Sequence, residues 1–217
     1  MKKLAAIAVL SAGIFTSCGS DTTSTSREAT ESKTETLQSD AAKYQQELSA
    51  FYNNPATTPL SEQDKKQFKG IKFFPINDKY RVEARFTPIE NGRIIPFTTS
   101  SNSIKEYREL GTASFTIDNK EQTLTLYEPA QTIAGAENLV FIPFKDATSG
   151  LTSYGAGRYL ELDKNDLNPE QTLIMDFNKA YNPYCAYSDD YNCPLPPAEN
   201  TLSVKIEAGV RYDYLPQ

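Results

Sequence analysis

The sequence predicts a mainly β protein, a β-rich α+β fold in which an antiparallel sheet of about eight strands closes into a barrel-like or sandwich structure. Three observations support this class. Two strong turn signals, Asn91-Gly92 and Asp118-Asn119, each separate segments in which apolar and polar residues alternate. Further short apolar segments follow, bounded by turn residues. Helical spacing of apolar residues is limited to the start of the domain, which predicts one or two N-terminal helices.

The helical elements come first in the predicted domain. Apolar residues recur at helical spacing over residues 39–53, and Ser39 or Asp40 can cap the start of this helix. A second, shorter helix is expected to begin at Ser61, because Ser61 and Asp64 form the Ser-x-x-Asp variant of a capping box.

The predicted strands follow the helices. Alternation from Tyr80 to Phe86 leads into Asn91-Gly92, which predicts a first hairpin with the segment after that turn. A second hairpin is expected around Asp118-Asn119. Further strands are expected over residues 139–144, 158–162, 172–178 and 202–208. The Pro-rich segment CPLPPAEN is instead expected to form a rigid loop that positions Glu199 and Asn200, because proline lacks the donor that a central strand needs.

The N-terminus predicts export and a lipid anchor. A short basic start precedes an apolar run from Leu4 to Phe15, which is too short to cross a bilayer as a helix and is typical of a signal peptide. Small residues before Cys18 resemble the bacterial lipoprotein signal, in which this cysteine is lipidated and becomes the mature N-terminus. The alternative is an ordinary signal peptide with an incidental cysteine. Because several acyl chains on one cysteine anchor a protein stably, we expect a lipid membrane of the bacterial cell envelope as a partner.

The chain therefore divides into three predicted segments. Residues 20–39 hold eleven Ser or Thr among twenty, with almost nothing apolar, which is typical of a disordered tether. The segments are a lipoprotein signal peptide (1–17), the lipidated cysteine with its tether (18–39) and a single β-rich domain (40–217).

Composition excludes several classes of function. The chain carries 22 basic and 28 acidic residues, and loss of Lys2 and Lys3 with the signal peptide leaves 20 against 28, or a net −8. This charge, without any basic cluster, predicts no nucleic-acid partner. The chain contains no histidine, which excludes Ser-His-Asp and Cys-His nucleophiles, HExxH zinc sites and two-histidine iron sites. No cofactor or metal is predicted, and a calcium site built from Asp146, Asp176 and Glu199 is the weakest of the alternatives.

Two cysteines remain beside Cys18. In an exported protein Cys185 and Cys193 are expected to form a disulfide. Free thiols and a redox site are the alternatives, although the spacing differs from the Cys-x-x-Cys pattern that lowers a thiol pKa.

Candidate functional residues occur in three polar segments. The segment FKDATSGLTSYGAGRYL lacks both the lysine of a P-loop and the Gly-x-Ser-x-Gly frame of a nucleophile elbow. An aspartate between apolar neighbours is costly unless paired, and Arg158 is the partner expected for Asp176. The candidate ligand-binding residues are Asp146, Thr148, Ser149, Tyr154, Arg158, Asp176, Asn178, Asn182, Glu199 and Asn200.

Several of these segments together resemble a known family. FIPFKDATSG, SYGAGRYL, MDFNKAYNPYCAYSDDYNCPLPPAENTLSVKIEAG and, upstream, FFPINDKYRVEARF are similar to the bacterial family called domain of unknown function sixteen-eighty-four. The resemblance runs from about Tyr44 onward and implies no established activity. It implies that the family's motif positions are Asp146, Thr148, Ser149, Gly150, Gly157, Arg158, Asp176, Asn178, Asn182, Cys185, Cys193, Pro194 and Asn200. Ser153 and Val210 depart from the usual family pattern.

Three functions remain open at this stage. The first is a binding module in which the Arg, Asp and Asn cluster at one end of the sheet holds a small polar or anionic ligand. The second is a structural or interaction domain of the cell envelope with a buried Arg-Asp pair. The third is a histidine-free hydrolase that uses Asp146 and Asp176 as acid and base.

Overall fold

The computed structural model describes residues 40–168, 170 and 172–212. The predicted signal peptide, Cys18 and the tether lie outside the described residues. Among the helices in the described part of the chain, none is long and apolar enough to span a membrane. The strands in chain order are β1 (Lys72–Phe73), β2 (Arg81–Pro88), β3 (Ile94–Thr98), β4 (Ile104–Ile117), β5 (Lys120–Pro129), β6 (Leu139–Phe144), β7 (Arg158–Asp163), β8 (Thr172–Asp176) and β9 (Val210–Arg211).

The helical elements are short apart from the first. A helix occupies residues 40–53. The others are α2 (Glu62–Gln67) and the 3-10 turns η1 (Asp78–Tyr80), η2 (Lys164–Asp166), η3 (Phe177–Lys179), η4 (Tyr184–Ala186) and η5 (Ala198–Asn200). The capping box predicted at Ser61 is confirmed, because Asp64 N donates to Ser61 Oγ and Ser61 N donates to Asp64 Oδ2, both at 3.2 Å.

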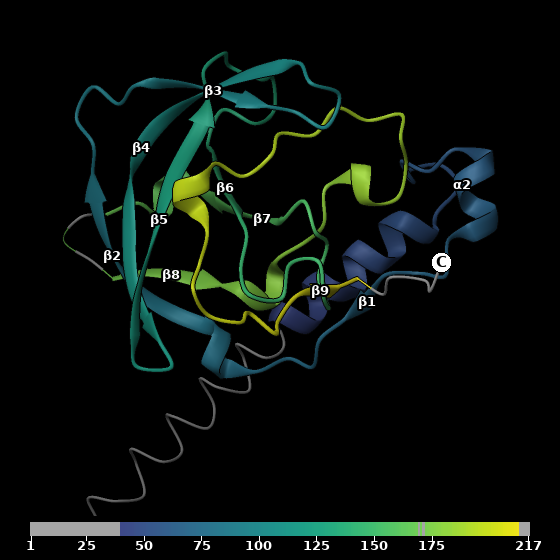
Figure 1. Ribbon diagram of the computed structural model, residues 1–217, viewed down its shortest axis with the longest axis horizontal. Coiled ribbons are helices and arrows are strands. Elements are labelled where there is room, and N and C mark those ends of the chain that lie inside the picture. Colours follow the sequence, from purple (N-terminus) through teal and green to yellow (C-terminus); the bar gives the residue numbers. More distant parts are fainter. Residues whose placement is uncertain (1–39, 169, 171, 213–217) are drawn as a thin grey trace, which may run out of the picture.

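The main sheet is antiparallel and curls into a half-barrel, which confirms the mainly β prediction (Figure 1). Its strand order is β7-β6-β5-β4-β2-β8, with β3 also paired to β4. Strands β7 and β8 are the two ends of this order, and they do not pair with each other in the described part of the chain. A separate two-stranded sheet joins β1 to β9. The curl therefore leaves an open seam between β7 and β8.

The hairpin predicted at Asn91-Gly92 is wrong, whereas the hairpin at Asp118-Asn119 is confirmed. Both β2 and β3 pair with β4, so the chain bends at Asn91-Gly92 and continues along the same neighbour. The physical reason is that β4 is 14 residues long and offers one edge to both segments. Asp118 and Asn119 both have positive φ, 53° and 57°, and connect β4 directly to β5.

The strand predicted over residues 202–208 is also wrong. This segment crosses the concave side of the sheet and buries Leu202, Val204, Ile206 and Ala208 in the core (Figure 1). The alternation in the sequence thus reports burial on one side of an extended segment and not a ladder of strand hydrogen bonds. The strand predicted over residues 172–178 ends at Asp176, where η3 begins.

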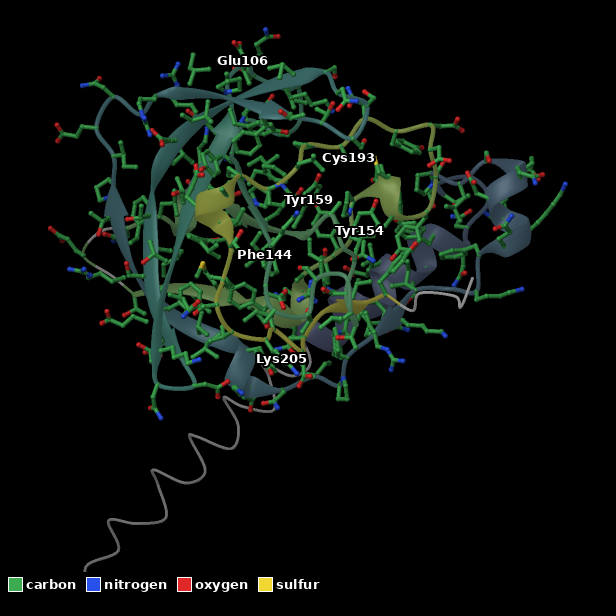
Figure 2. All side chains as sticks on the ribbon, in the orientation of Figure 1. Glu106, Phe144, Tyr154, Tyr159, Cys193 and Lys205 are labelled. Atoms are coloured by element: carbon green, nitrogen blue, oxygen red, sulfur yellow. A yellow bond between two sulfur atoms is a disulfide. The ribbon has the colours of Figure 1, made fainter. Side chains whose placement is uncertain are left out.

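Hydrophobic side chains fill both sides of β6 and β7. Val140, Ile142 and Phe144 face the core inside the half-barrel, while Phe141 and Tyr159 belong to a second cluster on the other face. Figure 2 shows Phe144 and Tyr159 in the interior of the domain. Burial on both faces accounts for the continuous apolar run of β6.

The segment that follows η3 covers this second cluster. The hydroxyl of Tyr159 donates to the carbonyl oxygen of Pro194 at 2.5 Å. The predicted disulfide between Cys185 and Cys193 is confirmed, with Cα atoms 6.2 Å apart. The disulfide therefore closes the loop that leads into the Pro-rich segment.

Candidate functional site

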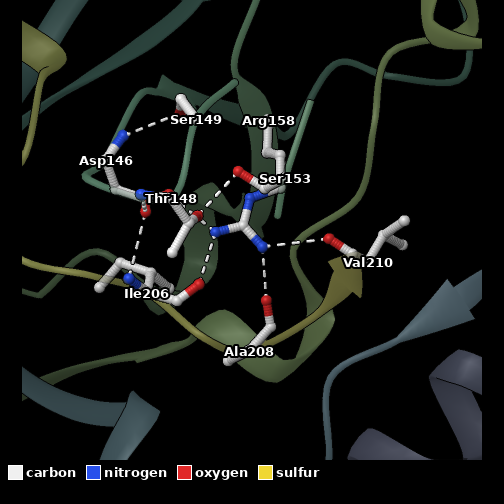
Figure 3. Close-up of polar contacts among 8 residues, drawn as sticks. All are labelled: Asp146, Thr148, Ser149, Ser153, Arg158, Ile206, Ala208 and Val210. Carbon is white, nitrogen blue, oxygen red and sulfur yellow. Dashed lines mark hydrogen bonds and ion pairs between the residues drawn. The ribbon is translucent and has the colours of Figure 1, made fainter. Parts of the chain in front are cut away.

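Arg158, the first residue of β7, is the centre of a buried polar network (Figure 3). Its side chain has 0% exposure. The guanidinium donates to Asp146 Oδ2 at 2.8 Å and to the carbonyl oxygen of Ile206 at 2.7 Å. It also donates to the carbonyl oxygens of Ala208 at 2.5 Å and Val210 at 3.2 Å. One arginine therefore serves as the donor for three carbonyls of the C-terminal segment.

Asp146 completes this network from the loop after β6. Its Oδ1 atom accepts hydrogen bonds from the backbone N–H groups of Thr148 at 2.7 Å and Ile206 at 3.2 Å. The Asp146 N–H donates to Ser149 Oγ at 3.1 Å, and the hydroxyls of Thr148 and Ser153 lie 2.8 Å apart. Both carboxylate oxygens of Asp146 are thus occupied by donors from the protein.

The surroundings of Arg158 exclude an external ligand. The guanidinium carbon lies 5.3 Å from the centroid of the Phe144 ring and 5.8 Å from that of Phe74. Burial lowers the pKa of the Arg158 guanidinium, and the charge of Asp146 opposes this shift. Gly157 has a φ of 103°, and a Cβ there would clash with the Phe144 carbonyl, so glycine is required where the chain enters β7.

The expected pairing of Arg158 with Asp176 is wrong, since the carboxylate that contacts Arg158 is Asp146. Asp176 Oδ1 instead accepts from the backbone N–H of Asn178 at 3.0 Å and from its Nδ2 at 2.8 Å. The side-chain amide of Asn178 in turn pairs with the backbone of Asn77, with two contacts of 3.0 Å. An open acid-base pair of Asp146 and Asp176 is therefore absent, because Asp146 is closed off by arginine.

The other predicted residues lie in separate contacts. Asn200 is fully buried, and its side-chain amide forms hydrogen bonds with backbone groups of two strands. It accepts from Thr125 N at 2.8 Å and donates to Thr125 O at 2.9 Å and Pro143 O at 2.8 Å. Glu199 is exposed and accepts from the hydroxyl of Tyr127 at 3.1 Å. These contacts hold the Pro-rich loop against β5 and β6.

The two remaining candidates also contact protein groups. Tyr154 donates through its hydroxyl to the carbonyl oxygen of Cys185 at 3.1 Å. Asn182 is buried and donates to the Tyr187 hydroxyl at 2.8 Å, and its Oδ1 accepts no hydrogen bond from the described residues. The predicted site is thus not one ligand pocket but several structural contacts, of which Asp146, Thr148, Ser149 and Arg158 form one network.

A cleft lies at the open seam, where sequence reasoning did not place a site. It has a volume of about 790 Å³. Its lining residues come from both ends of the strand order, from the loop before β6 and from the start of the N-terminal helix. Asp176 is the predicted site residue that lines it, whereas Arg81, Glu161 and Lys179 also line it and were not predicted. These residues had no shared sequence signal, because only the curl of the sheet brings β7 toward β8.

Polar groups in the cleft have unused hydrogen-bonding capacity. Arg81 and Lys179 are half-buried, and neither side chain forms an ion pair or hydrogen bond with a described residue. Glu161 Oε1 accepts a hydrogen bond from the Tyr181 hydroxyl. Glu161 is exposed at the surface of the cleft, but desolvation by the surrounding protein raises the pKa of its carboxyl, and the Tyr181 hydrogen bond opposes this shift. No group of three or more residues suited to a metal ion is present in the described part of the chain.

The comparisons define the class of protein. The family described as "Protein of unknown function (DUF1684)" matches residues 66–211, so the chain belongs to this family. A related solved structure is the solution NMR structure of an uncharacterised protein from gene locus rrnAC0354 of Haloarcula marismortui. It is 33% identical, with a TM-score of 0.67, over 84% of this chain and 98% of that chain. No curated protein matches the chain.

Proposed function

We propose that this protein is an exported, lipid-anchored protein of the bacterial cell envelope whose domain binds a small polar ligand in the seam cleft between β7 and β8. The observation that carries the proposal is a preformed cleft of about 790 Å³ lined by Arg81 and Lys179, two cations without a partner among the described residues. Small-molecule sites commonly have volumes of roughly 300 to 1,000 Å³ and a few well-placed polar groups.

The buried network around Arg158 supports this function indirectly. Arg158 begins β7, and β7 supplies one wall of the cleft. By tying β7 to the C-terminal segment, the guanidinium helps to hold this edge strand, which on the side away from β6 pairs among the described residues through the isolated bridge between Tyr159 and Tyr181. We therefore assign the network of Asp146 and Arg158 to the positioning of this wall, and we assign ligand binding to the cleft.

The same buried pair favours a second candidate, a structural or interaction domain of the envelope. A closed polar network between Asp146 and Arg158 specifies a fold without any ligand. The two candidates differ at the cleft, because a purely structural domain gives no role to Arg81 and Lys179.

A ligand panel tests the binding function. Melting temperatures of the detergent-solubilised full-length protein would be measured with dipeptides, monosaccharides, nucleosides and dicarboxylates. We expect one class to raise the melting temperature of the wild type and not that of the Arg81→Ala, Lys179→Ala double variant. Arg85→Ala is the matched control, because Arg85 lies on the same strand and does not line the cleft. Equal stabilisation of the double variant, or none in the wild type by any class, would contradict the proposal.

A second experiment tests the anchor. Cys18→Ser is expected to move the protein from the membrane fraction to the soluble fraction, since the lipidated cysteine is the proposed attachment. Mass spectrometry of the wild-type N-terminal peptide should show acyl groups on Cys18. An unmodified Cys18 in membrane-bound protein would refute the anchor and leave the cleft proposal standing.

A further inference from the structure

The two walls of the seam cleft carry different charges. The ionisable lining residues comprise six carboxylates and two cations. Both cations, Arg81 and Lys179, belong to the wall made by β2, β8 and η3. The opposite wall, made by β7 and its flanking turns, carries carboxylates and no cation among the lining residues that are described. The cleft is therefore bipolar across the seam.

The cationic wall presents a pair of donors beside one carboxylate. Arg81 and Asp176 are paired residues in the register of β2 and β8, and Lys179 follows three residues after Asp176. Two other arginines with partly or fully buried side chains have carboxylate partners. Arg108 pairs with Glu128, and Arg158 pairs with Asp146. Arg81 has no carboxylate partner among the residues that the structure describes, although it is half-buried. Its guanidinium and the Lys179 ammonium are thus available to an incoming anion.

Glu161 is the distinctive group of the acidic wall. Local contacts account for its neighbours, because Asp163 accepts from Asn165 N at 2.8 Å and Asp166 accepts from Asp163 N at 3.3 Å. Glu161 is instead held by Tyr181, 20 residues away, and only through Oε1. Its Oε2 atom accepts no hydrogen bond from the described residues. A carboxylate fixed through one oxygen is suited to accept from a ligand through the other.

A half-buried aliphatic side chain also belongs to the cleft. Ile174 of β8 lines the cleft, whereas Leu160 and Leu162 of β7 also line it but pack in or against the hydrophobic core. A ligand bound between the charged groups would therefore also contact an apolar surface.

We propose that the cleft binds a zwitterion, a free amino acid or short peptide, with its carboxylate on Arg81 and Lys179 and its ammonium on Glu161. This inference rests on the proposed binding function. The planar guanidinium matches a carboxylate, lysine adds a second positive charge, and an ammonium group donates to a carboxylate oxygen. A ligand with one charge only would leave one wall without its complement.

Four matched probes test the inference by isothermal titration calorimetry on the detergent-solubilised full-length protein. They are alanyl-alanine, its C-terminal amide, its N-acetyl derivative and the N-acetyl amide, which carry both charges, the cation only, the anion only and neither. Free alanine is added to distinguish an amino acid from a peptide. Removing either charge of the dipeptide should weaken binding by about tenfold or more, since a hydrogen bond to a charged group contributes that much.

Variants assign each charge to its wall. Arg81→Ala should weaken alanyl-alanine by about tenfold and leave the amide unchanged, because the amide already lacks the carboxylate. Glu161→Gln should weaken alanyl-alanine and leave the N-acetyl derivative unchanged. Arg85→Ala and Glu121→Gln, at positions that do not line the cleft, are the controls, and melting curves verify that all variants fold.

The outcomes separate this inference from the function on which it rests. Equal affinity for all four dipeptide probes, or exclusive binding of an uncharged ligand such as a monosaccharide in the cleft, would overturn the zwitterion and keep the binding function. Failure of every probe and every panel ligand to bind would overturn both.

Discussion

Replacing Arg158 with alanine is expected to destabilise the domain more than any change at an exposed ion pair. The substitution leaves the charge of Asp146 buried without its partner, which costs about 3 to 5 kcal/mol in comparable cases. It also removes the side-chain donor from the carbonyls of Ile206, Ala208 and Val210, at about 1 kcal/mol for each hydrogen bond. The expected loss is therefore about 5 kcal/mol or more, similar to the whole stability of a marginal domain.

Urea denaturation followed by tyrosine fluorescence measures this loss as a change in the midpoint. The matched control is Lys79→Ala, which breaks an ion pair with Asp118 at the same 2.8 Å distance but between side chains that are 42% and 53% exposed. This control should lose far less stability than Arg158→Ala, because solvent screens an exposed ion pair. A loss below about 2 kcal/mol for Arg158→Ala would refute the assignment of the guanidinium as the tie between β7 and the C-terminal segment.

A double variant separates the ion pair from the carbonyl contacts. Arg158→Met with Asp146→Leu removes both charges, and a buried pair taken alone can be replaced by apolar residues at little cost. The three carbonyls still lose their donor, and the N–H groups of Thr148 and Ile206 lose their acceptor, so we expect the double variant to remain destabilised by about 3 to 5 kcal/mol. Recovery of wild-type stability would show that these hydrogen bonds contribute nothing.

Three further predictions concern other parts of the chain. Cys185→Ser with Cys193→Ser should lower the free energy of unfolding by about 2 to 3 kcal/mol, as chain entropy predicts for a loop of this size, and an unchanged urea midpoint would contradict it. Asn200→Ala, which removes three hydrogen bonds in a fully buried position, should cost about 3 kcal/mol by the same assay, and a loss under about 1 kcal/mol would argue against its bracing role. The raised pKa of Glu161 makes the folded state bind its proton more tightly than the unfolded chain does. That stabilisation is full below the unfolded pKa of about 4.3 and is lost as pH rises through the folded pKa. As pH rises through that window, the wild type should lose this stabilisation, whereas the Glu161→Gln variant has no carboxyl to titrate. The melting temperature of the variant should therefore rise relative to that of the wild type, and a constant difference would show that the pKa of Glu161 is not raised.

Local signals in the sequence predicted local structure well. The Asp118-Asn119 turn, the capping box at Ser61 and the bridge between Cys185 and Cys193 all depend on residues within ten positions of one another. Asn91-Gly92 shows the limit of such a signal. A turn is present there, but whether a turn reverses the chain depends on the strand beside it, and β4 accepts both flanking segments on one edge.

The candidate site shows a similar limit. The sequence indicates Asp146 and Arg158 as candidate residues, but it does not indicate that they pair with each other. A buried arginine or aspartate needs a partner, but its residue type does not say which one. Here the partner depends on the path of the Gly-rich turn between Asp146 and Arg158. The alternation over residues 202–208 likewise predicted which side chains are buried, and only the structure showed that the carbonyls between them accept from Arg158.

The β-rich class, the family motifs and the absence of histidine chemistry follow from the sequence, because they depend on composition and short-range order along the chain. The burial of Arg158 and the position of the cleft depend instead on how distant segments pack in three dimensions. Arg81, Glu161 and Lys179 are far apart in the sequence and share no motif. They come to one cleft because the sheet curls without closing, and that curl is a property of all its strands together.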